Sequence, residues 1–269
     1  MNAPVRFETE GAVATITLDA PASRNALTPQ MLCLLADAIK EFAASDALRV
    51  AILTGAGDRA FCAGGDLART LPLMSGARLP EDDWDRRLLS DPEVLAASGL
   101  REFTVDKPVI AAVNGACMAA GFEILLGTDI RYCAEHASFA LPEVKRALIP
   151  FAGSLARLPR QIPYCIAMEL LLTGEPLSAV EAQRIGLVNR VVPAADLMPL
   201  ARRTAEAIAR NGPVAVQAVK RTVVAASGRS LPEAYQLEDA AKALVMASED
   251  AREGPRSFME KRAPVYVGR

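Results

Sequence analysis

The hydrophobic residues of the chain follow two periods, and each predicts a type of element. Residues 12–18 alternate in the manner of a strand, and the continuous apolar runs at 49–54 and 109–113 predict strands buried on both faces. Thr28-Pro29 is typical of a helix start, and apolar residues at helical spacing extend that helix to about Ala44. Further strands are predicted at 129–133, 138–141 and 187–192.

Beyond Ala194 the pattern contains helices only. They are predicted at 194–211, 213–227 and about 231–250, with prolines near their starts and glycines at their ends. This change of character indicates a core in residues 1–194 and a helical region in residues 195–269. Helices with apolar faces need a surface to cover them, so we expect this region to form the oligomer.

Composition narrows the class of protein. The chain has 269 residues, 51% of them hydrophobic and 23% charged, as in a globular protein with a full core. A net charge of −2 without a basic block argues against nucleic-acid binding. No apolar run reaches the length of a membrane span, and the N-terminus lacks a signal-peptide core. Five cysteines without a C-x-x-C pair favour reduced thiols and a cytoplasmic protein without a membrane partner.

A single histidine, His136, limits the chemistry. It lies in a polar stretch after a predicted strand and is expected in a surface loop. Without a second histidine, His-rich metal sites are excluded, so we expect no metal. There is also no G-x-S-x-G elbow and no Walker A loop. Acid–base work therefore falls mainly to carboxylates.

One glycine motif raises a cofactor alternative. Residues 55–60, Gly-Ala-Gly-Asp-Arg-Ala, match the G-x-G-x-x-A pattern of a dinucleotide loop. That fingerprint requires a helix to begin at the glycines, and the following residues 61–66 do not favour one. Gly64-Gly65 is more typical of backbone that comes close to a ligand.

The stretch from Lys107 to Glu123 organises the rest. Its buried strand ends at Asn114-Gly115, small residues follow, and a helical run begins near Phe122. A helix that starts at such a turn directs free N–H groups and its positive dipole end at a bound ligand. Glu123 lies in the first turn of this apolar helix. It is either a solvent-facing carboxylate or a site residue.

Two small-residue loops and two carboxylates in apolar settings form a candidate site. The loops are 61–66 and 115–121, and the carboxylates belong to Glu123 and Glu143. Backbone N–H groups from two loops that converge on one point make an oxyanion hole, which stabilises charge on a carbonyl or enolate oxygen. Two carboxylates in one dry pocket tend to separate their pKa values, which provides an acid and a base.

At these residues the chain resembles the crotonase family, also called the enoyl-CoA hydratase/isomerase superfamily. The resemblance covers nearly the whole chain, and its motifs are Arg24-Asn-Ala-Leu-Thr, Phe61-Cys-Ala-Gly-Gly-Asp-Leu67, Lys107-Pro-Val-Ile-Ala-Ala-Val-Asn-Gly115, Phe122-Glu, Asp129-Ile, Phe139-Ala-Leu-Pro-Glu143, Leu171-Leu-Thr-Gly174, Ala182-x-x-x-Gly186-Leu-Val and Glu260-Lys-Arg. It implies an α/β fold, a crotonase-like spiral of ββα units with a C-terminal helical oligomerisation region. That region would form a homotrimer or a dimer of trimers.

The resemblance also implies a site for an acyl-CoA thioester, which is the substrate; no separate cofactor is expected. Ala63 and Ala120 would donate backbone N–H groups to the thioester oxygen. The residues implied along CoA are Arg24, Asn25, Ala26, Leu27, Phe61, Ala63, Gly64, Gly65, Asp66, Leu67 and, from a neighbouring subunit, Lys261. Phe151 and Trp84 are expected to shape the acyl pocket.

Active hydratases of this family carry two glutamates, and this chain has glutamate at both matching positions, Glu123 and Glu143, which lie twenty residues apart. The resemblance therefore implies an enoyl-CoA hydratase, in which Glu123 deprotonates water for attack on a 2-enoyl-CoA and Glu143 protonates its α-carbon. The alternatives are another crotonase reaction, such as an enoyl-CoA isomerase or a carnitinyl-CoA-type dehydratase, or a non-catalytic acyl-CoA-binding protein. Residues 151–154, Phe-Ala-Gly-Ser, replace the Gly-Ala-Gly-Gly common in the family. The irregular segment 67–105 is expected to border the acyl pocket as a mobile cap; the alternative is a solvated loop with a short amphipathic helix.

Overall fold

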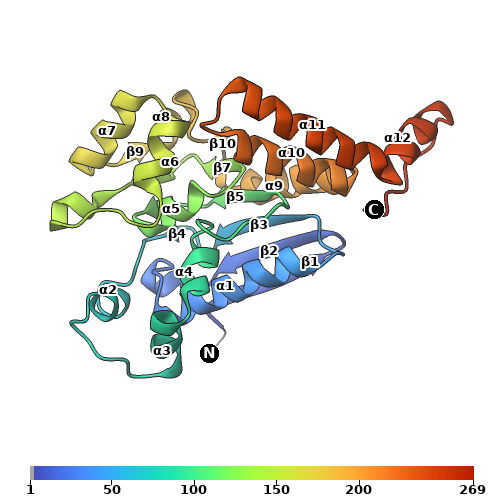
Figure 1. Cartoon of the computed structure of the whole chain (residues 1–269). Coiled ribbons are helices and arrows are strands. Elements are labelled where there is room, and N and C mark those ends of the chain that lie inside the picture. Colours follow the sequence, from blue (N-terminus) through green and yellow to red (C-terminus); the bar gives the residue numbers. More distant parts are fainter. Residues whose placement is uncertain (1–2) are drawn as a thin grey trace.

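The computed structural model describes residues 3–269 and has a six-stranded sheet as its framework (Figure 1). Its strands, in spatial order, are β1 (Val5–Glu10), β2 (Val13–Leu18), β3 (Val50–Gly55), β5 (Val109–Val113), β7 (Ile130–Ala134) and β10 (Arg190–Val192). β1 and β2 are antiparallel, and every later pair in this sheet is parallel. Strands β3 and β5 are buried at every residue, as their continuous apolar runs predict, and so is β2, which was predicted from alternation.

A smaller four-stranded sheet carries the second strand of each repeat. Its order is β4 (Ala60–Cys62), β6 (Ala116–Met118), β8 (Ser138–Ala140) and β9 (Leu177–Ser178). The chain alternates between the sheets, because β3, β5 and β7 of the large sheet are each followed by β4, β6 and β8 of the small one. Helical segments then return the chain to the large sheet. This is the expected spiral of ββα units, and it is confirmed.

Twelve α-helices and two 3₁₀ helices complete the part of the chain from residue 3 to residue 269. The α-helices are α1 (Pro29–Ala44), α2 (Thr70–Met74), α3 (Asp83–Ser90), α4 (Pro92–Ser98), α5 (Ala120–Leu125), α6 (Ser154–Gln161), α7 (Tyr164–Thr173), α8 (Ala179–Arg184), α9 (Ala194–Ala209), α10 (Pro213–Ala226), α11 (Leu231–Ala247) and α12 (Asp250–Met259). The 3₁₀ helices are η1 (Pro21–Ser23) and η2 (Pro142–Arg146). No helix within residues 3–269 has the length and apolar character needed to cross a membrane.

Helix α1 confirms the predicted start and end. The Thr28 side chain accepts a hydrogen bond from the N–H of Met31, and Pro29 occupies the first turn. One face of the helix, which includes Leu35, Ile39 and Phe42, is buried in the main hydrophobic core.

The C-terminal helices do not all lie outside the core. Leu197, Leu200 and Ala201 of α9 are buried against the large sheet beside Ile52 and Ile110. Helix α9 therefore belongs to the core, although the change in pattern near Ala194 favours an appended region from residue 195. The reason is that the large sheet needs a helix on its second face.

Helices α10 and α11 pack on each other and expose the apolar surface expected of an interface. The exposed large side chains on these two helices are Val219, Val223, Val224, Leu231, Tyr235, Leu244 and Met246. Helix α12 was not predicted, because the last helix expected from the sequence ends at about residue 250. It extends away from the sheets at the red end of the chain (Figure 1).

Two further loop predictions are settled by the fold. Residues 55–60 lead into strand β4 and not into a helix, so the dinucleotide-loop alternative is wrong. Residues 67–105 contain the short helices α2, α3 and α4 in place of one irregular loop.

Candidate active site

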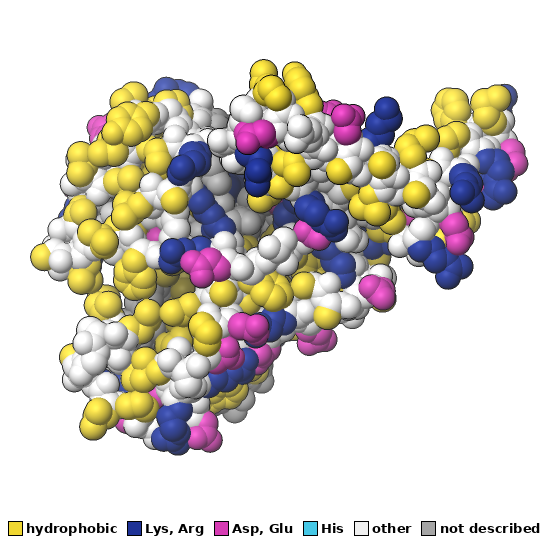
Figure 2. Space-filling model, in the orientation of Figure 1, with side chains coloured by type: hydrophobic (Ala, Val, Ile, Leu, Met, Phe, Trp, Pro, Cys, Tyr) yellow, Lys and Arg dark blue, Asp and Glu magenta, His cyan; other side chains and the backbone are white. Residues whose placement is uncertain are grey.

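The two predicted carboxylates, Glu123 and Glu143, line one cavity of about 360 Å³. Its walls come from the loop after β4, the helices α2 and α4, the start of α5, the helix η2 and the segment before α6. Figure 2 shows hydrophobic side chains (yellow) on both sides of the gap between the part that carries α2 and the part that carries α6. The expectation that segment 67–105 borders the pocket agrees with this lining; its mobility stays a prediction.

Glu123 lies in the first turn of α5 and is 2% exposed. One carboxylate oxygen, Oε1, accepts hydrogen bonds from the N–H of Ala152 at 2.7 Å and from the N–H and the hydroxyl of Ser154 at 3.1 and 2.9 Å. Burial raises the pKa of Glu123, and the bonds from Ser154 and Ala152 oppose that rise. The three donors hold the carboxylate in place and favour its ionised form.

Glu143 follows β8 in the first turn of η2 and has a different environment. Its Oε2 atom is buried and has no hydrogen-bond partner within residues 3–269. Burial, together with the charge of Glu123, raises the pKa of Glu143 to about 7. Because Oε2 has no donor and the backbone N–H of Glu143 only partly opposes the effect of burial, this carboxyl group is suited to hold a proton near neutral pH.

Close packing of glycines brings the two small-residue loops together. Gly64 has a φ of +94°, and a Cβ built on it would lie 2.6 Å from the Cβ of Ala119. A Cβ on Gly121 would lie 2.6 Å from the Cβ of Cys62. Only glycine fits at both positions, so the loop after β4 and the start of α5 meet without intervening side chains.

The two predicted oxyanion donors, Ala63 and Ala120, have different surroundings. Ala120 is the first residue of α5 and lines the cavity, so its N–H has no partner within the helix. The N–H of Ala63, in contrast, donates to the carbonyl of Arg24 at 3.0 Å, and Ala63 does not line the cavity. Ala63 is therefore unavailable as a donor.

Gly65 takes the place that the sequence assigned to Ala63. It lines the cavity together with Ala120. Within residues 3–269 the N–H groups of Gly65 and Ala120 donate to no protein acceptor. The neighbouring groups are occupied, because the N–H of Leu27 donates to the Gly64 carbonyl and that of Asp66 to the Leu27 carbonyl. Two free N–H groups from two loops thus border one cavity.

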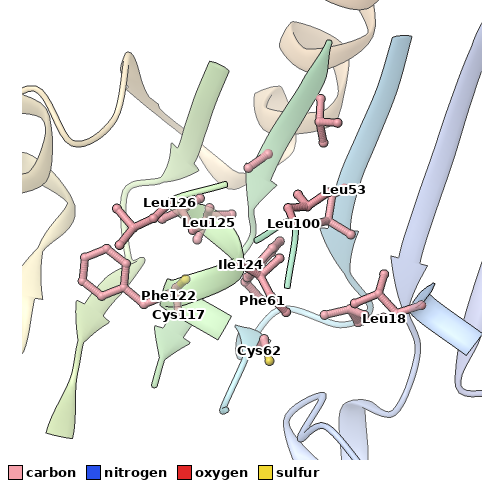
Figure 3. Packing of buried hydrophobic residues seen from close by; sticks show 14 of the residues in the cluster. Leu18, Leu53, Phe61, Cys62, Leu100, Cys117, Phe122, Ile124, Leu125 and Leu126 are labelled. Carbon is pink, nitrogen blue, oxygen red and sulfur yellow. The ribbon is translucent and has the colours of Figure 1, made fainter. Parts of the chain in front are cut away.

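Two residues implied along CoA have side chains that cannot reach a ligand. Asn25 is fully buried: its Nδ2 donates to the carbonyls of Ala60 at 2.8 Å and Ala56 at 3.1 Å, and its Oδ1 accepts from the N–H of Ala20. Phe61 is also fully buried and lies among Leu18, Leu53 and Ile124 in the core (Figure 3). Both side chains support the loops from behind, and the direct contacts implied for them are wrong.

The other implied CoA positions divide between two cavities. Leu27, Gly65 and Leu67 line the cavity that holds the glutamates. Arg24 lines a smaller cavity of about 180 Å³, which Arg59 also borders.

Three of the positions implied along CoA line neither cavity. The Oδ1 atom of Asp66 accepts hydrogen bonds from the N–H groups of Ala68 and Arg69 and so caps the turn before α2. Gly64 is buried between the loops, and Ala26 is half-buried.

The remaining predicted residues have different outcomes. Phe151 lines the glutamate cavity, as expected. Trp84 does not: it lies on α3 and packs against the main core, because α3 rests on α1. Lys261 is exposed just after α12, far from α2 and α5 (Figure 1), so a contact with CoA bound to a neighbouring subunit stays a prediction.

Sequence reasoning missed several supporting residues. Ser154 was noted only as a departure from a family pattern, yet it supplies two of the three donors to Glu123. His136 is exposed, as predicted, but its ring nitrogen also bonds to the carbonyls of Asp58 and Asn114 behind the loops. Four cysteines are buried and Cys165 is exposed.

Comparison with known proteins agrees with this geometry. Residues 8–269 match the family described as enoyl-CoA hydratase/isomerase. The chain is 39% identical over 274 residues to a carnitinyl-CoA dehydratase of Proteus mirabilis, with 100% of both chains covered. It is 40% identical over 262 residues to enoyl-CoA hydratase EchA19 of Mycobacterium tuberculosis, with 97% of this chain and 96% of the relative covered.

Solved structures give the same result. A structure titled as a putative enoyl-CoA hydratase/isomerase from Mycobacterium abscessus superposes with a TM-score of 0.88 at 43% identity, covering 99% of this chain and 100% of the other. Enoyl-CoA hydratase from Bacillus anthracis superposes with a TM-score of 0.88 at 36% identity and the same coverage. The expected crotonase-like fold is confirmed, and the chain belongs to the enoyl-CoA hydratase/isomerase family.

Proposed function

We propose that this protein is an enoyl-CoA hydratase that adds water across the α,β double bond of a 2-enoyl-CoA and catalyses the reverse dehydration. The observation that carries the proposal is the unequal pair of glutamates in one cavity. Oε1 of Glu123 accepts three hydrogen bonds, and buried Oε2 of Glu143 accepts none from residues 3–269. Water addition needs such a pair, with one carboxylate as base and one carboxylic acid as proton donor.

The proposed reaction follows from these positions. Glu123 removes a proton from water as its oxygen forms a bond to the β-carbon. The π electrons move to the thioester oxygen, where the N–H groups of Gly65 and Ala120 stabilise the enolate. Glu143 then gives its proton to the α-carbon and the carbonyl re-forms. One proton has moved from Glu143 to Glu123 through the substrate, and exchange with solvent resets the pair.

The smaller cavity is the proposed binding site for the nucleotide end of CoA. Arg24, which borders it, lies three residues before Leu27, and Leu27 pairs with Gly65 on the lining of the glutamate cavity. Arg24 and Arg59 outnumber Asp58 on its lining and supply positive charge suited to phosphate groups. With the phosphates near these arginines, the pantetheine arm would run past Gly65, and the thioester would reach the two N–H groups.

A second candidate reaction is the dehydration of a carnitinyl-CoA-type substrate. It is favoured by the relatives of that name, which match the full length of the chain. The same acid–base pair serves both reactions, so the reacting centre alone does not separate them. An isomerase that shifts a double bond needs only one of the two acids, and a binding protein needs neither, so both fit the retained pair less well.

The test is a direct assay with crotonyl-CoA. Hydration predicts loss of the enone absorbance and a product heavier by one water, identified by mass spectrometry. A shifted double bond formed from a 3-enoyl-CoA without any hydrated product would overturn the proposal in favour of isomerisation. We also propose a homotrimer or dimer of trimers, built through α10 and α11, in the cytoplasm; sedimentation of the whole protein tests the assembly.

A further inference from the structure

Outside the two loops, most of the large side chains that line the glutamate cavity are hydrophobic. Helix α2 contributes Leu71 and Met74, and helix α4 contributes Leu95. Leu148 and Ile149, from the segment before α6, complete this set. We call these five residues the acyl wall.

The acyl wall exposes large apolar side chains that a folded chain would ordinarily cover. Leu95 is 40% exposed and Ile149 is 62% exposed, and the neighbouring lining residues Leu67 and Phe151 are 59% and 53% exposed. Exposed apolar side chains gathered around one cavity mark a binding site for an apolar group.

The charges on the cavity lining are already engaged. Its ionisable side chains are Arg101, Glu102, Glu123 and Glu143. Arg101 lies 3.4 Å from Glu102 and donates to the Phe151 carbonyl at 2.9 Å. The two glutamates are committed to the reaction, so Glu102, the partner of Arg101, is the one other acid on the lining formed by residues 3–269.

The lining also lacks the aromatic groups that bind quaternary ammonium ions. Recognition of such cations usually relies on several aromatic faces arranged as a cage. Phe151 is the only aromatic residue on this lining within residues 3–269.

The size of the cavity also bears on the acyl group. An apolar cavity of about 150 Å³ is enough to hold a benzene molecule. The glutamate cavity, at about 360 Å³, is more than twice as large. It has room for an acyl group considerably larger than crotonyl.

We propose that the acyl wall selects an uncharged, apolar acyl group longer or bulkier than crotonyl, and disfavours an acyl group that carries a quaternary ammonium. This inference rests on the proposed function, because it places the acyl end of a CoA thioester against the acyl wall. It separates the two candidate reactions that share the glutamate pair.

The test measures binding with saturated thioesters, which cannot be hydrated. Calorimetry would give the Kd of the whole protein for butanoyl-, octanoyl- and γ-trimethylammoniobutanoyl-CoA. Octanoyl-CoA has four more methylenes to bury on the wall than butanoyl-CoA, so it is expected to bind tighter by about tenfold even if the wall covers only part of them. The cationic thioester is expected to bind more weakly than butanoyl-CoA. Equal Kd values for the two uncharged thioesters, or tightest binding of the cationic one, would overturn the inference.

A pair of matched variants places the preference on the acyl wall. Leu95→Glu puts a carboxylate on the lining, whereas Leu89→Glu makes the same change at a 52% exposed position outside it. Leu95→Glu is expected to abolish most of the octanoyl preference and to improve binding of the cationic thioester; Leu89→Glu is expected to change neither. An unchanged preference in a folded Leu95→Glu protein would contradict the assignment.

The outcomes also separate this inference from the proposed function. If the protein hydrates crotonyl-CoA but binds butanoyl- and octanoyl-CoA with equal Kd, the proposed function stands and the inference is overturned. If octanoyl-CoA binds much more tightly but no enoyl-CoA is hydrated, the acyl wall stands and the hydratase assignment is overturned. If Leu95→Glu fails to fold, the series on the unmodified protein decides alone.

Discussion

Ser154 donates two hydrogen bonds to a single oxygen of Glu123, from its backbone N–H at 3.1 Å and from its hydroxyl at 2.9 Å. Together with the N–H of Ala152, they engage Oε1, so Oε2 is the oxygen proposed to take the proton from water. Ser154 thereby acts as a positioning residue for the base. It also fixes the orientation of the carboxylate, on which the efficiency of proton removal depends.

Ser154→Ala removes the hydroxyl donor and keeps the backbone donor. Without that bond the pKa of Glu123 is expected to rise, because the donor stabilises the ionised form. A hydrogen bond to a charged group contributes about 1.5–3 kcal/mol, so kcat/KM on the acid side of the profile should fall by roughly tenfold or more. The measurement is kcat/KM against pH. The control is Ser257→Ala, which removes another buried hydroxyl in α12. An acid limb that does not move would restrict Ser154 to a structural role.

Gly64→Ala tests the contact between the two loops. The new Cβ would meet the Cβ of Ala119 at 2.6 Å on a backbone with a φ of +94°. We expect stability to fall by about 1–3 kcal/mol and kcat to fall because both N–H donors move. Gly186→Ala is the control, since Gly186 has a φ of +78° and no atom within 4 Å of the new Cβ. Thermal unfolding that is lowered equally in both variants would show that backbone strain, and not the contact, accounts for the loss.

The protonation of the pair predicts the pH dependence. The reacting form carries one proton, on Glu143 before hydration and on Glu123 after it. Burial and the charge of Glu123 raise the pKa of Glu143 to about 7, so kcat/KM should fall as the pH rises through about 7 and that proton is lost. At low pH the second proton binds Glu123 and activity falls again. Because hydration and dehydration use the same total of protons, both directions should show one bell-shaped profile. If kcat/KM rose with pH for hydration and fell with pH for dehydration, the proposal that both reactions use the same two glutamates would be contradicted.

Residues 67–105, the predicted cap, contain an internal ion pair between Arg78 and Asp85. Asp85 is fully buried on α3, and the hydrogen bond from Arg78 lowers its pKa to about 2. The stability that the Asp85 carboxylate contributes is present above the pKa of the unfolded chain and is lost as the pH falls toward 2.

Arg78→Ala removes the partner of Asp85, so this variant should speed limited proteolysis within residues 67–105. Bound acyl-CoA should slow that cleavage. Arg86→Ala, which breaks an exposed pair with Asp83, is the control. Cleavage that starts elsewhere would argue against a cap.

Much of the fold could be predicted from the sequence because its periodicity is strong. The runs that became β3 and β5 are apolar at almost every position, and α1 has both a capping threonine and a proline at its start. Only those site residues whose side-chain type itself indicates a role could be predicted. Glu123 and Glu143 are acids in apolar surroundings, so they were recognisable before the structure.

The direction of backbone groups was not predictable. Ala63 and Gly65 lie in one small-residue run, and the positive φ of Gly64 breaks the regular alternation of its N–H groups. Only the three-dimensional structure shows that the N–H of Ala63 faces Arg24 while Gly65 lines the cavity. Asn25 was misassigned for a related reason: a polar residue in a motif resembles a ligand contact until its partners are known.

The central claim is that Glu123 and Glu143 share one water addition, and substitution of each by glutamine tests it most directly. Glutamine keeps the size and most of the hydrogen bonding but removes the ionisable group. Because general acid–base catalysis contributes ~10²–10⁴ in rate, each variant should lose about that much kcat with crotonyl-CoA while its Kd for butanoyl-CoA is unchanged. The double variant should lose less than the product of the single losses. Full hydratase activity in Glu143→Gln would contradict the two-carboxylate mechanism.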